Sequence, residues 1–378
     1  MAWRAKCKRL RKVNMPVMRK IPWWQTEFST GEADAASKAV SAGRLSQGPI
    51  VAQFEDLLRD YLGVRNVVAT TSGSDALLLS LWAAGIRPGD EVLVPNRTWI
   101  ATAHSVLLLG AVPIIIDTDI DRPVISLADL EKKVSSKTKA VIPVHLNGRD
   151  AHIDDVINFG NRYELKVIED AAQALGSKDL SGSFLGTKSL AGCFSLSVAK
   201  VISSGQGGFI ASNDDEFAMQ LRLMRTHGVE NVVEPKNWNR PGFNFRFTDV
   251  LASIGIEQFK KLDSRLNRLR QIHQKYEDGL LSVSGINLIN VNVSQGEIGP
   301  YIEVLCEDRQ ALIAHLNNFG IETRIFYPDV DKADYLSPNS ENSNSKKFGQ
   351  EGLYLPSGPA LSDESIDFVV EKIKEFHG

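Results

Sequence analysis

The strongest constraint on the fold is a regular alternation of short apolar runs with gaps long enough for a helix. The runs are rich in β-branched residues and lie at Asn66–Ala69, Glu91–Val94, Val112–Ile116, Ala140–Val144 and Lys166–Ile168. Their first residues are 25, 21, 28 and 26 residues apart, which leaves room for a crossover helix between neighbours. The pattern predicts an α/β fold with a mostly parallel central sheet and helices on both of its faces.

Two features further along the chain qualify this pattern. After residue 168 the apolar runs move closer together, at Cys193–Leu196 and Gly208–Ala211, with a Gly-rich loop between them. The short spacing predicts that the sheet ends in at least one antiparallel strand. From Leu251 to Leu280, apolar residues recur mostly at steps of three and four, which predicts one long amphipathic helix.

Beyond this helix the sequence predicts a second, smaller domain. Strand-like runs at Ile286–Val293 and Tyr301–Leu305 precede a terminal helical pattern at Asp363–Phe376. We therefore expect a large domain over residues 21–250, followed by a bridging helix and a small C-terminal α+β domain over residues 251–378.

The first 20 residues differ from the rest of the chain. They contain eight Lys or Arg and no Asp or Glu, and they lack the apolar core of a signal peptide. We interpret residues 1–20 as a basic, disordered leader or an upstream start, with the native start at Met15 or Met18. A targeting role is the alternative.

Charge and composition exclude several classes of function. The net charge is −3, but the chain after residue 20 has 35 basic and 46 acidic residues, so this body is acidic and no nucleic-acid partner is expected. The longest apolar stretch, Val106–Ile116, is far shorter than the roughly 18 residues of a membrane span. The three cysteines form no CxxC pair, so we expect no disulfide framework, no metal site and a cytoplasmic location.

The first candidate functional segment is Thr70–Ser74, which follows the first predicted strand and opens a helix. Unpaired N–H groups at a helix N-terminus attract anions, and Gly73 lets a ligand come close to the backbone. A phosphate group fits this description. The alternative is that Ser72 or Ser74 merely caps the helix.

Two further residues could carry chemistry. Asp170 comes at the end of a predicted strand, at the edge of a parallel sheet where ligands bind, although it could equally cap the next helix. Lys200 follows an apolar run, so burial would lower its pKa and leave a neutral amine that can form a Schiff base. Taken alone, such a lysine more often reaches into solvent from a strand end.

Together these three features fit one cofactor, pyridoxal 5'-phosphate. It needs a phosphate cradle, a carboxylate at its pyridinium nitrogen and a lysine that holds it covalently. With the features in this order, the sequence resembles the DegT/DnrJ/StrS family of sugar aminotransferases, which have the aspartate-aminotransferase fold, type I. The resemblance runs from about Ile21 to the C-terminus. It rests on Gly48-Pro49, Phe54-Glu55, Ser72–Leu77, Pro88–Val92, Thr138–His145, Glu169–Ala174, Gly242–Arg246 and Leu355-Pro356.

The resemblance implies a role for each matching residue. Lys200 would form the Schiff base and move a proton between substrate and cofactor, and Asp170 would pair with the pyridinium nitrogen. Gln173 would lie near the phenolic oxygen, and Trp99 would stack on the ring. The implied phosphate contacts are Gly73, Ser74, Ser195 and, from the other subunit of a homodimer with shared active sites, Asn244. Taken singly, the aromatic, serine and asparagine members of this set also fit a core, strand or turn position.

These expectations converge on the transfer of an amino group from an amino acid, L-glutamate in the first instance, to a nucleotide-linked keto-sugar in amino-sugar biosynthesis. A keto-sugar without a nucleotide or a keto-cyclitol stays open, because no motif reads a base or a diphosphate. A sugar dehydratase of the same family is a further alternative, but it would carry His in place of Lys200. Outside this class, a nicotinamide dehydrogenase would need a GxGxxG turn after the first strand, and a non-catalytic regulatory homologue would not need Lys200 or Asp170.

Overall fold

The computed structural model describes residues 20–238, 240–336 and 342–378. The basic leader expected over residues 1–20 therefore lies, apart from Lys20, outside the described residues. Within the described ranges, no helix is both long enough and apolar enough to cross a bilayer.

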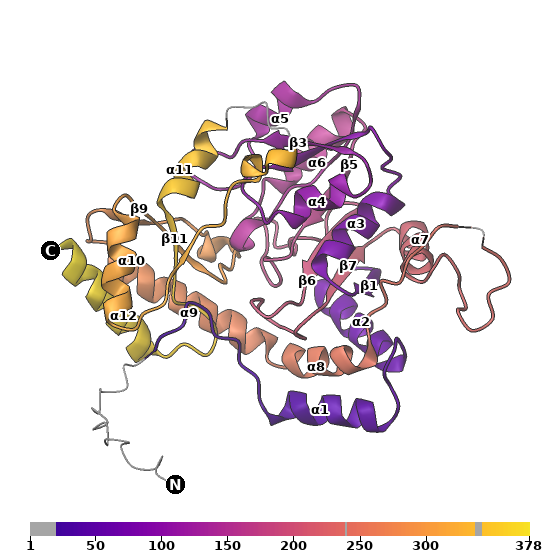
Figure 1. Cartoon of the computed structure of the whole chain (residues 1–378), viewed down its shortest axis with the longest axis horizontal. Helices are drawn as coiled ribbons and strands as arrows, with labels where there is room; N and C mark the ends of the chain where they lie inside the picture. Colours follow the sequence, from indigo (N-terminus) through magenta and orange to yellow (C-terminus); the bar gives the residue numbers. More distant parts are fainter. Residues whose placement is uncertain (1–19, 239, 337–341) are drawn as a thin grey trace, which may run out of the picture.

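A seven-stranded sheet forms the centre of the larger part of the molecule (Figure 1). Its strand order is β1-β7-β6-β5-β4-β2-β3. Neighbours from β6 to β3 are parallel, whereas β7 runs antiparallel to both β6 and β1. The strands are β1 Asn66–Thr70, β2 Glu91–Pro95, β3 Val112–Ile116, β4 Thr138–Val141, β5 Lys166–Asp170, β6 Ala191–Ser195 and β7 Gly208–Ser212. The predictions of an α/β fold and of an antiparallel strand are confirmed.

Helices cover both faces of this sheet because successive strand residues point in opposite directions. In β1, Val67 packs into one core cluster and Val68 into another. The cluster of Val68 includes residues of α3, α4 and α7, and that of Val67 includes residues of α2, α5, α6 and α8. The helices are α1 Thr30–Ser41, α2 Pro49–Leu62, α3 Gly73–Ala83, α4 Ala101–Leu107, α5 Leu127–Lys133, α6 Ile153–Arg162, α7 Asp215–Arg225 and α8 Asp249–Phe259.

A second, four-stranded sheet lies in the C-terminal part. Its order is β10-β11-β9-β8, and every neighbouring pair is antiparallel. The elements are β8 Ile286–Leu288, β9 Ile302–Cys306, α10 Arg309–Asn318, β10 Arg324–Ile325, α11 Ser343–Glu351, β11 Gly352–Leu355 and α12 Asp363–His377. Short 3₁₀ helices lie at Leu146–Gly148, Val293–Gln295, Val330–Lys332 and Asp334–Leu336.

The long helix predicted from Leu251 to Leu280 is in fact two helices, α8 and α9 (Leu262–Leu280). The chain turns at Lys260 and Lys261. There Lys261 Nζ binds Glu32 Oε1 at 2.8 Å, close to the start of α1. The apolar stripe continues across the break because both helices bury their apolar residues in the same core cluster.

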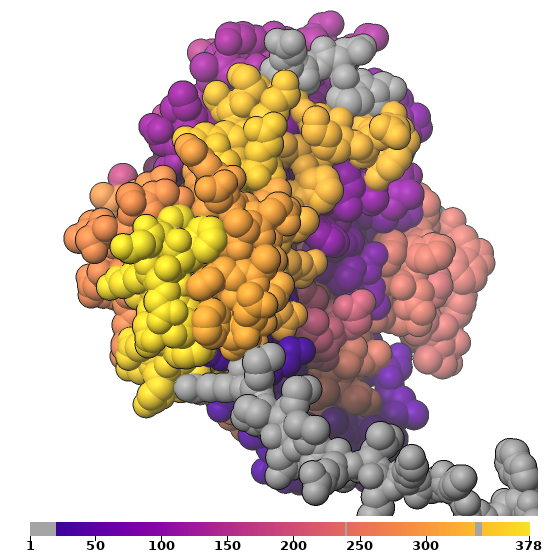
Figure 2. Space-filling view, turned by 60° about the vertical axis from the view of Figure 1, so that its left-hand side comes forward, coloured from indigo at the N-terminus to yellow at the C-terminus, as the bar shows by residue number. Residues whose placement is uncertain are grey.

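Buried polar contacts join the C-terminal part to the large sheet. Arg97 Nη1 pairs with Asp329 Oδ1 at 2.7 Å, and both side chains are buried. Asn96 Nδ2 donates to Ser345 Oγ at 2.7 Å. In Figure 2 the orange and yellow C-terminal elements are seen packed against the purple residues of the larger part. The junction between the two parts is therefore tightly connected, and the site described below lies along it.

Candidate active site

A cavity of about 430 Å³ opens between the large sheet and the small one. One wall consists of strand ends and loops of the large sheet, and the other carries Tyr301, Arg324, Tyr327 and Tyr354 from the small-sheet region. Seven of the eight predicted site residues line this cavity, namely Gly73, Ser74, Trp99, Asp170, Gln173, Ser195 and Lys200. Asn244 does not.

The turn between β1 and α3 lines one part of the cavity. Ser72 is the N-cap of α3, and its Oγ accepts a hydrogen bond from Asp75 N at 3.0 Å. The N–H groups of Gly73 and Ser74 have no partner within the helix, as at any helix start. A β-carbon on Gly73 would lie 2.9 Å from Ser195 Cβ, so glycine lets the turn approach the end of β6. The result is a tight cradle of N–H groups suited to an anion.

Asp170 ends β5 and is only 5% exposed. Its Oδ2 accepts a hydrogen bond from Thr102 Oγ1 at 2.8 Å, and its Oδ1 accepts one from Ala172 N at 3.1 Å. Burial raises the pKa of Asp170, and these two donors and the nearby Lys200 partly oppose that rise. The carboxylate is therefore held in one orientation, ready to accept a bond from a cationic N–H group in the cavity.

Lys200 lies in the loop between β6 and β7, with its side chain partly exposed to the cavity. Burial lowers the pKa of Lys200 to about 8, although Asp170 acts in the opposite direction. Two distant hydroxyls fix the backbone just before it. Tyr301 Oη donates to Ala199 O at 2.6 Å, and Thr26 Oγ1 donates to Val198 O. The loop thus presents an amine that loses its proton at an unusually low pH, on a backbone held from two sides.

A buried asparagine orients the amide of Gln173. Asn147 N donates to Gln173 Oε1 at 2.9 Å, and because this donor requires the oxygen, Gln173 Nε2 must point the other way. Asn147 has a left-handed backbone with φ 51°, and its amide pairs with Tyr301. Its Oδ1 accepts from Tyr301 N at 2.8 Å, and its Nδ2 donates to Tyr301 O at 2.9 Å. Gln173 is therefore oriented by a residue that also binds the backbone just before β9, an inner strand of the small sheet.

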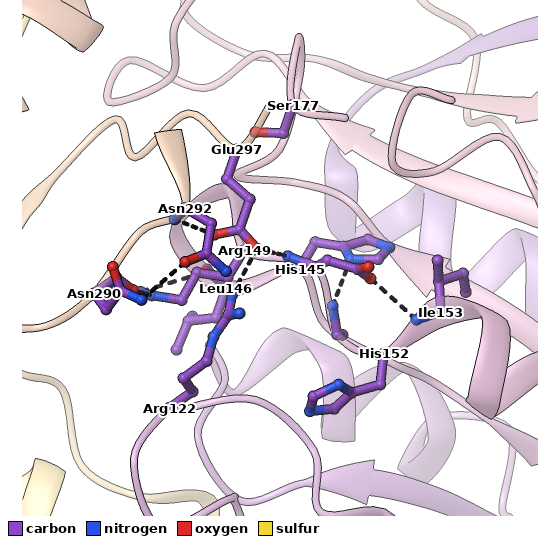
Figure 3. A network of polar contacts seen from close by, with 12 residues as sticks. Arg122, His145, Leu146, Arg149, His152, Ile153, Ser177, Asn290, Asn292 and Glu297 are labelled. Atoms are coloured by element: carbon purple, nitrogen blue, oxygen red, sulfur yellow. Dashed lines mark hydrogen bonds and ion pairs between the residues drawn. The ribbon is translucent and has the colours of Figure 1, made fainter. Parts of the chain in front are cut away.

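Arg149 also joins the two parts of the molecule, and Figure 3 shows it beside Asn290, which follows β8. Its Nε donates to Asn290 O at 2.8 Å and its Nη2 to Ile289 O at 3.1 Å, while Nη1 pairs with Glu303. The guanidinium is fully buried, so these partners replace the water that it has lost. The segment from Asn147 to Arg149 thus fastens the end of β4 to the small sheet.

His145 precedes this segment but does not line the cavity. Its Nε2 lies 2.9 Å from Glu169 Oε2, and both side chains are fully buried. Burial disfavours the charged imidazole, but the hydrogen bond to Glu169 and the nearby negative charges of Glu169 and Asp150 together outweigh this effect and raise the pKa of His145. Glu169 also accepts hydrogen bonds from the backbone of Gly186 and Ser189. This pair therefore braces the strand that carries Asp170.

Trp99 and Asn244 occupy contrasting positions. Trp99 lines the cavity, is 51% exposed, and meets the Tyr327 ring edge-on at 5.6 Å between centroids. Asn244 is exposed and forms a β-bridge with Thr226, after the long loop that follows α7 and projects from the body in Figure 1. Its neighbour Phe243 is 62% exposed.

Comparison with known proteins gives these features a family. The family model of the DegT/DnrJ/EryC1/StrS aminotransferases matches residues 27–374. The chain belongs to this family. It is a pyridoxal phosphate-dependent sugar aminotransferase of amino-sugar biosynthesis, as the sequence resemblance implied.

Individual relatives agree with this assignment. The GDP-perosamine synthase of Escherichia coli O157:H7 is 31% identical over 364 residues, covering 95% of this chain and 99% of that protein. The GDP-perosamine synthase of Caulobacter vibrioides is 34% identical over 343 residues, covering 87% and 91%. Among solved structures, S. venezuelae DesV in complex with a ketimine intermediate has a TM-score of 0.90 and 29% identity, covering 95% of this chain and 98% of that one.

The residues of this aminotransferase fit its cofactor. A β-carbon at Gly208 would lie 2.5 Å from Gly73 N, so glycine at the start of β7 keeps a side chain away from this N–H group. This leaves the N–H groups at the start of α3 open to a phosphate. Asp170 supplies an oriented acceptor and Lys200 an amine with a lowered pKa on the same cavity. The phosphate cradle, the carboxylate and the amine that the cofactor needs are therefore all present on one cavity.

The sequence alone did not reveal the residues of the small-sheet wall. It also did not reveal the residues that hold Asp170 and Gln173 in place on the large-sheet wall. Thr102 and Asn147 act through hydrogen bonds that no local pattern reveals. Tyr301, Arg324 and Tyr327 come more than 100 residues after Lys200 and reach the cavity only through the tertiary fold. A weak signal was the concentration of tyrosines in the predicted small domain, which contains five of the seven in the chain.

Proposed function

We propose that this enzyme transfers the amino group of L-glutamate to the keto group of a nucleotide-linked keto-sugar, and that it works as a homodimer. The observation that carries the proposal is the single cavity that brings together Lys200, Asp170 and the start of α3. The names of two relatives, both GDP-perosamine synthases, support a nucleotide-linked substrate.

The proposal gives each cavity residue a role. Gly73, Ser74 and Ser195 hold the cofactor phosphate, Asp170 accepts a bond from the pyridinium N–H, and Lys200 Nζ is the covalent anchor. Trp99 covers the ring, and Gln173 donates from Nε2 to the phenolic oxygen. When bound, the cofactor supplies an electron sink for the bonds around the reacting carbon.

Lys200 Nζ is also the proposed carrier of the proton. An amine of lowered pKa can take a proton from the substrate carbon and return one without a large energetic cost. The fixed backbone at Ala199 keeps Nζ close to the reacting atoms. Asp170 stays ionised once a cationic N–H group pairs with it, because that pairing opposes the effect of its burial.

The homodimer rests on the segment around Asn244. This residue does not line the cavity of its own chain, and Phe243, Trp238 and Val233 nearby are exposed apolar side chains. Exposed apolar groups on a projecting loop favour contact with a second protein surface. We infer that Asn244 contacts the cofactor phosphate in the other subunit.

Two further proposals concern organisation and location. The separate seven- and four-stranded sheets support a division into a large domain over residues 21–250 and a bridging helix with a small domain over residues 251–378. The buried free thiols of Cys193 and Cys306 support a reducing compartment, so we place the enzyme in the cytoplasm.

The first experiment is an absorption spectrum of the purified protein with added pyridoxal phosphate, before and after L-glutamate. We expect a visible band that fades on addition of glutamate and returns with a nucleotide-linked keto-sugar. A band that does not respond to glutamate would contradict the donor. A return of the band only with free keto-sugars or keto-cyclitols would contradict the nucleotide.

A further inference from the structure

Arg324 is a cationic residue on the small-sheet wall of the cavity. It lies in β10, where it pairs with Tyr354 of β11, and its side chain is exposed and lines the cavity. The guanidinium lies over the Trp23 ring, 5.0 Å from its centroid, and makes no ion pair with any other residue that the structure describes. Its charge is therefore available to a ligand.

A chain of contacts connects Arg324 to the loop that carries Lys200. The Trp23 ring lies 5.9 Å from the Tyr301 ring, centroid to centroid. Tyr301 Oη in turn donates to the carbonyl oxygen of Ala199, the residue before Lys200. Arg324 thus reaches the Lys200 loop through two aromatic side chains that also line the cavity.

One charged side chain of the cavity has no part in the proposed function. Among the residues that the structure describes, the charged ones that line it are Asp170, Lys200 and Arg324. The proposed function uses Asp170 and Lys200 for the cofactor. An amino acid donor also brings carboxylates into the cavity, and a carboxylate taken out of water needs a cationic partner. Arginine suits this task because its fork of N–H groups matches both carboxylate oxygens.

We infer that Arg324 binds a carboxylate of the amino donor; this inference rests on the proposed function. A diphosphate on the sugar substrate is the other anion that could reach an arginine. The α-carboxylate is attached to the carbon that bears the reacting amino group, so it must lie inside the cavity with Lys200. A diphosphate is separated from the keto carbon by the sugar ring and need not enter the cavity that Lys200 and Arg324 both line. The donor carboxylate is therefore the better match.

The test uses the cofactor-loaded enzyme without keto-sugar, so that the reaction with the donor is followed alone. L-glutamate is titrated into wild type, Arg324→Gln and Arg324→Lys while the visible absorbance is recorded. Arg270→Gln is the matched control, because Arg270 lies on α9, outside the cavity lining. Glutarate, a dicarboxylate without an amino group, and GDP are titrated by calorimetry as binding probes.

We expect the glutamate concentration for half-maximal change to rise roughly 10- to 100-fold in Arg324→Gln. Glutarate binding should weaken in parallel, with a smaller effect in Arg324→Lys and less than about a twofold change in Arg270→Gln. GDP binding should stay within about twofold of wild type.

Unchanged glutamate and glutarate titrations in Arg324→Gln would overturn the inference. Loss of GDP binding with glutarate unaffected would also overturn it and assign the arginine to the sugar substrate. If wild type does not respond to glutamate, the proposed donor is wrong, and the glutarate titration still decides the role of Arg324. Should Arg324→Gln fail to fold, judged by its melting temperature, Arg324→Lys keeps the charge and supplies the same measurements.

Discussion

The two walls of the cavity are built in different ways. The large-sheet wall comes from segments that follow β1, β2, β4, β5 and β6, and it carries a helix start, an amine and a carboxylate held by hydrogen bonds. The small-sheet wall is mainly aromatic, with a single cation, and its residues come from segments far apart in the chain. A fixed polar wall suits one constant cofactor, and an aromatic wall suits substrates that come and go. We infer from this difference that the large-sheet wall serves the chemistry and the small-sheet wall serves selection of the substrate.

Lys200→Ala, on the large-sheet wall, should have the greatest effect on activity. Without its amine, the enzyme would lose both the proposed covalent anchor and the proposed proton carrier, so we expect transamination to fall by at least about 10³-fold. Steady-state rates and the visible spectrum with added cofactor measure the loss.

Lys178→Ala is the control for that change, because Lys178 contacts the Phe184 ring and does not line the cavity. Its activity should match that of wild type. Activity retained by Lys200→Ala would refute the proposed division of the two walls.

Thr102→Val tests the hydrogen bond that holds Asp170 in place on the same wall. The change removes the hydroxyl that donates to Asp170 Oδ2 while keeping the shape of the side chain. Hydrogen bonds to charged groups contribute about 1.5–3 kcal/mol, so we expect cofactor affinity to fall roughly 10- to 100-fold.

Thr98→Val is the matched variant, since Thr98 Oγ1 bonds Thr102 at 2.8 Å and not the carboxylate. Equilibrium binding of pyridoxal phosphate should be weakened less in this variant. Equal losses in the two variants would show that the effect does not act through Asp170.

The rate at which the enzyme takes up its cofactor should depend on pH. The proposed covalent attachment of the cofactor to Lys200 would require the neutral amine, and burial lowers the pKa of Lys200 to about 8. The neutral fraction therefore grows as pH rises, and the association rate should increase about tenfold from pH 7 to pH 9, with its midpoint near 8. Stopped-flow absorbance measures this rate. A midpoint near the ordinary lysine value would show that the cavity does not desolvate the amine.

The smallest expected effect is on the substrate wall. Tyr301→Phe removes the hydroxyl that donates to Ala199 O and keeps the ring. A neutral hydrogen bond contributes about 1 kcal/mol, so we expect kcat to fall about fivefold with little change in cofactor affinity.

Tyr276→Phe supplies the comparison for that variant, because Tyr276 Oη bonds Pro356 O at 2.9 Å inside the core and Tyr276 does not line the cavity. The two variants should lose similar thermal stability, but the kinetic effect should be confined to Tyr301→Phe. A kinetic loss of the same size in Tyr276→Phe would mean that Tyr301 acts through stability alone.

The two walls also differ in how much of their structure the sequence predicts. The strands and the residues after them were predictable, because a parallel sheet places its strand ends at one edge and Gly73, Asp170 and Lys200 each follow an apolar run. The break at Lys260 was not, since α8 and α9 share one core cluster and the apolar period continues across it. The positions of Trp23 and Arg324 depend on how the two sheets pack. The role of Asn244 stays a prediction, because it concerns a second chain.

Asn147 has a consequence for how the two walls respond to their ligands. One residue orients Gln173 through its backbone and pairs with the backbone of Tyr301 through its amide. A ligand that shifts Tyr301 therefore changes the free energy of holding Gln173 in place. By thermodynamic linkage the coupling is reciprocal, so a cofactor bound by Gln173 and an amino donor that shifts Tyr301 would each alter the affinity of the other by the same factor.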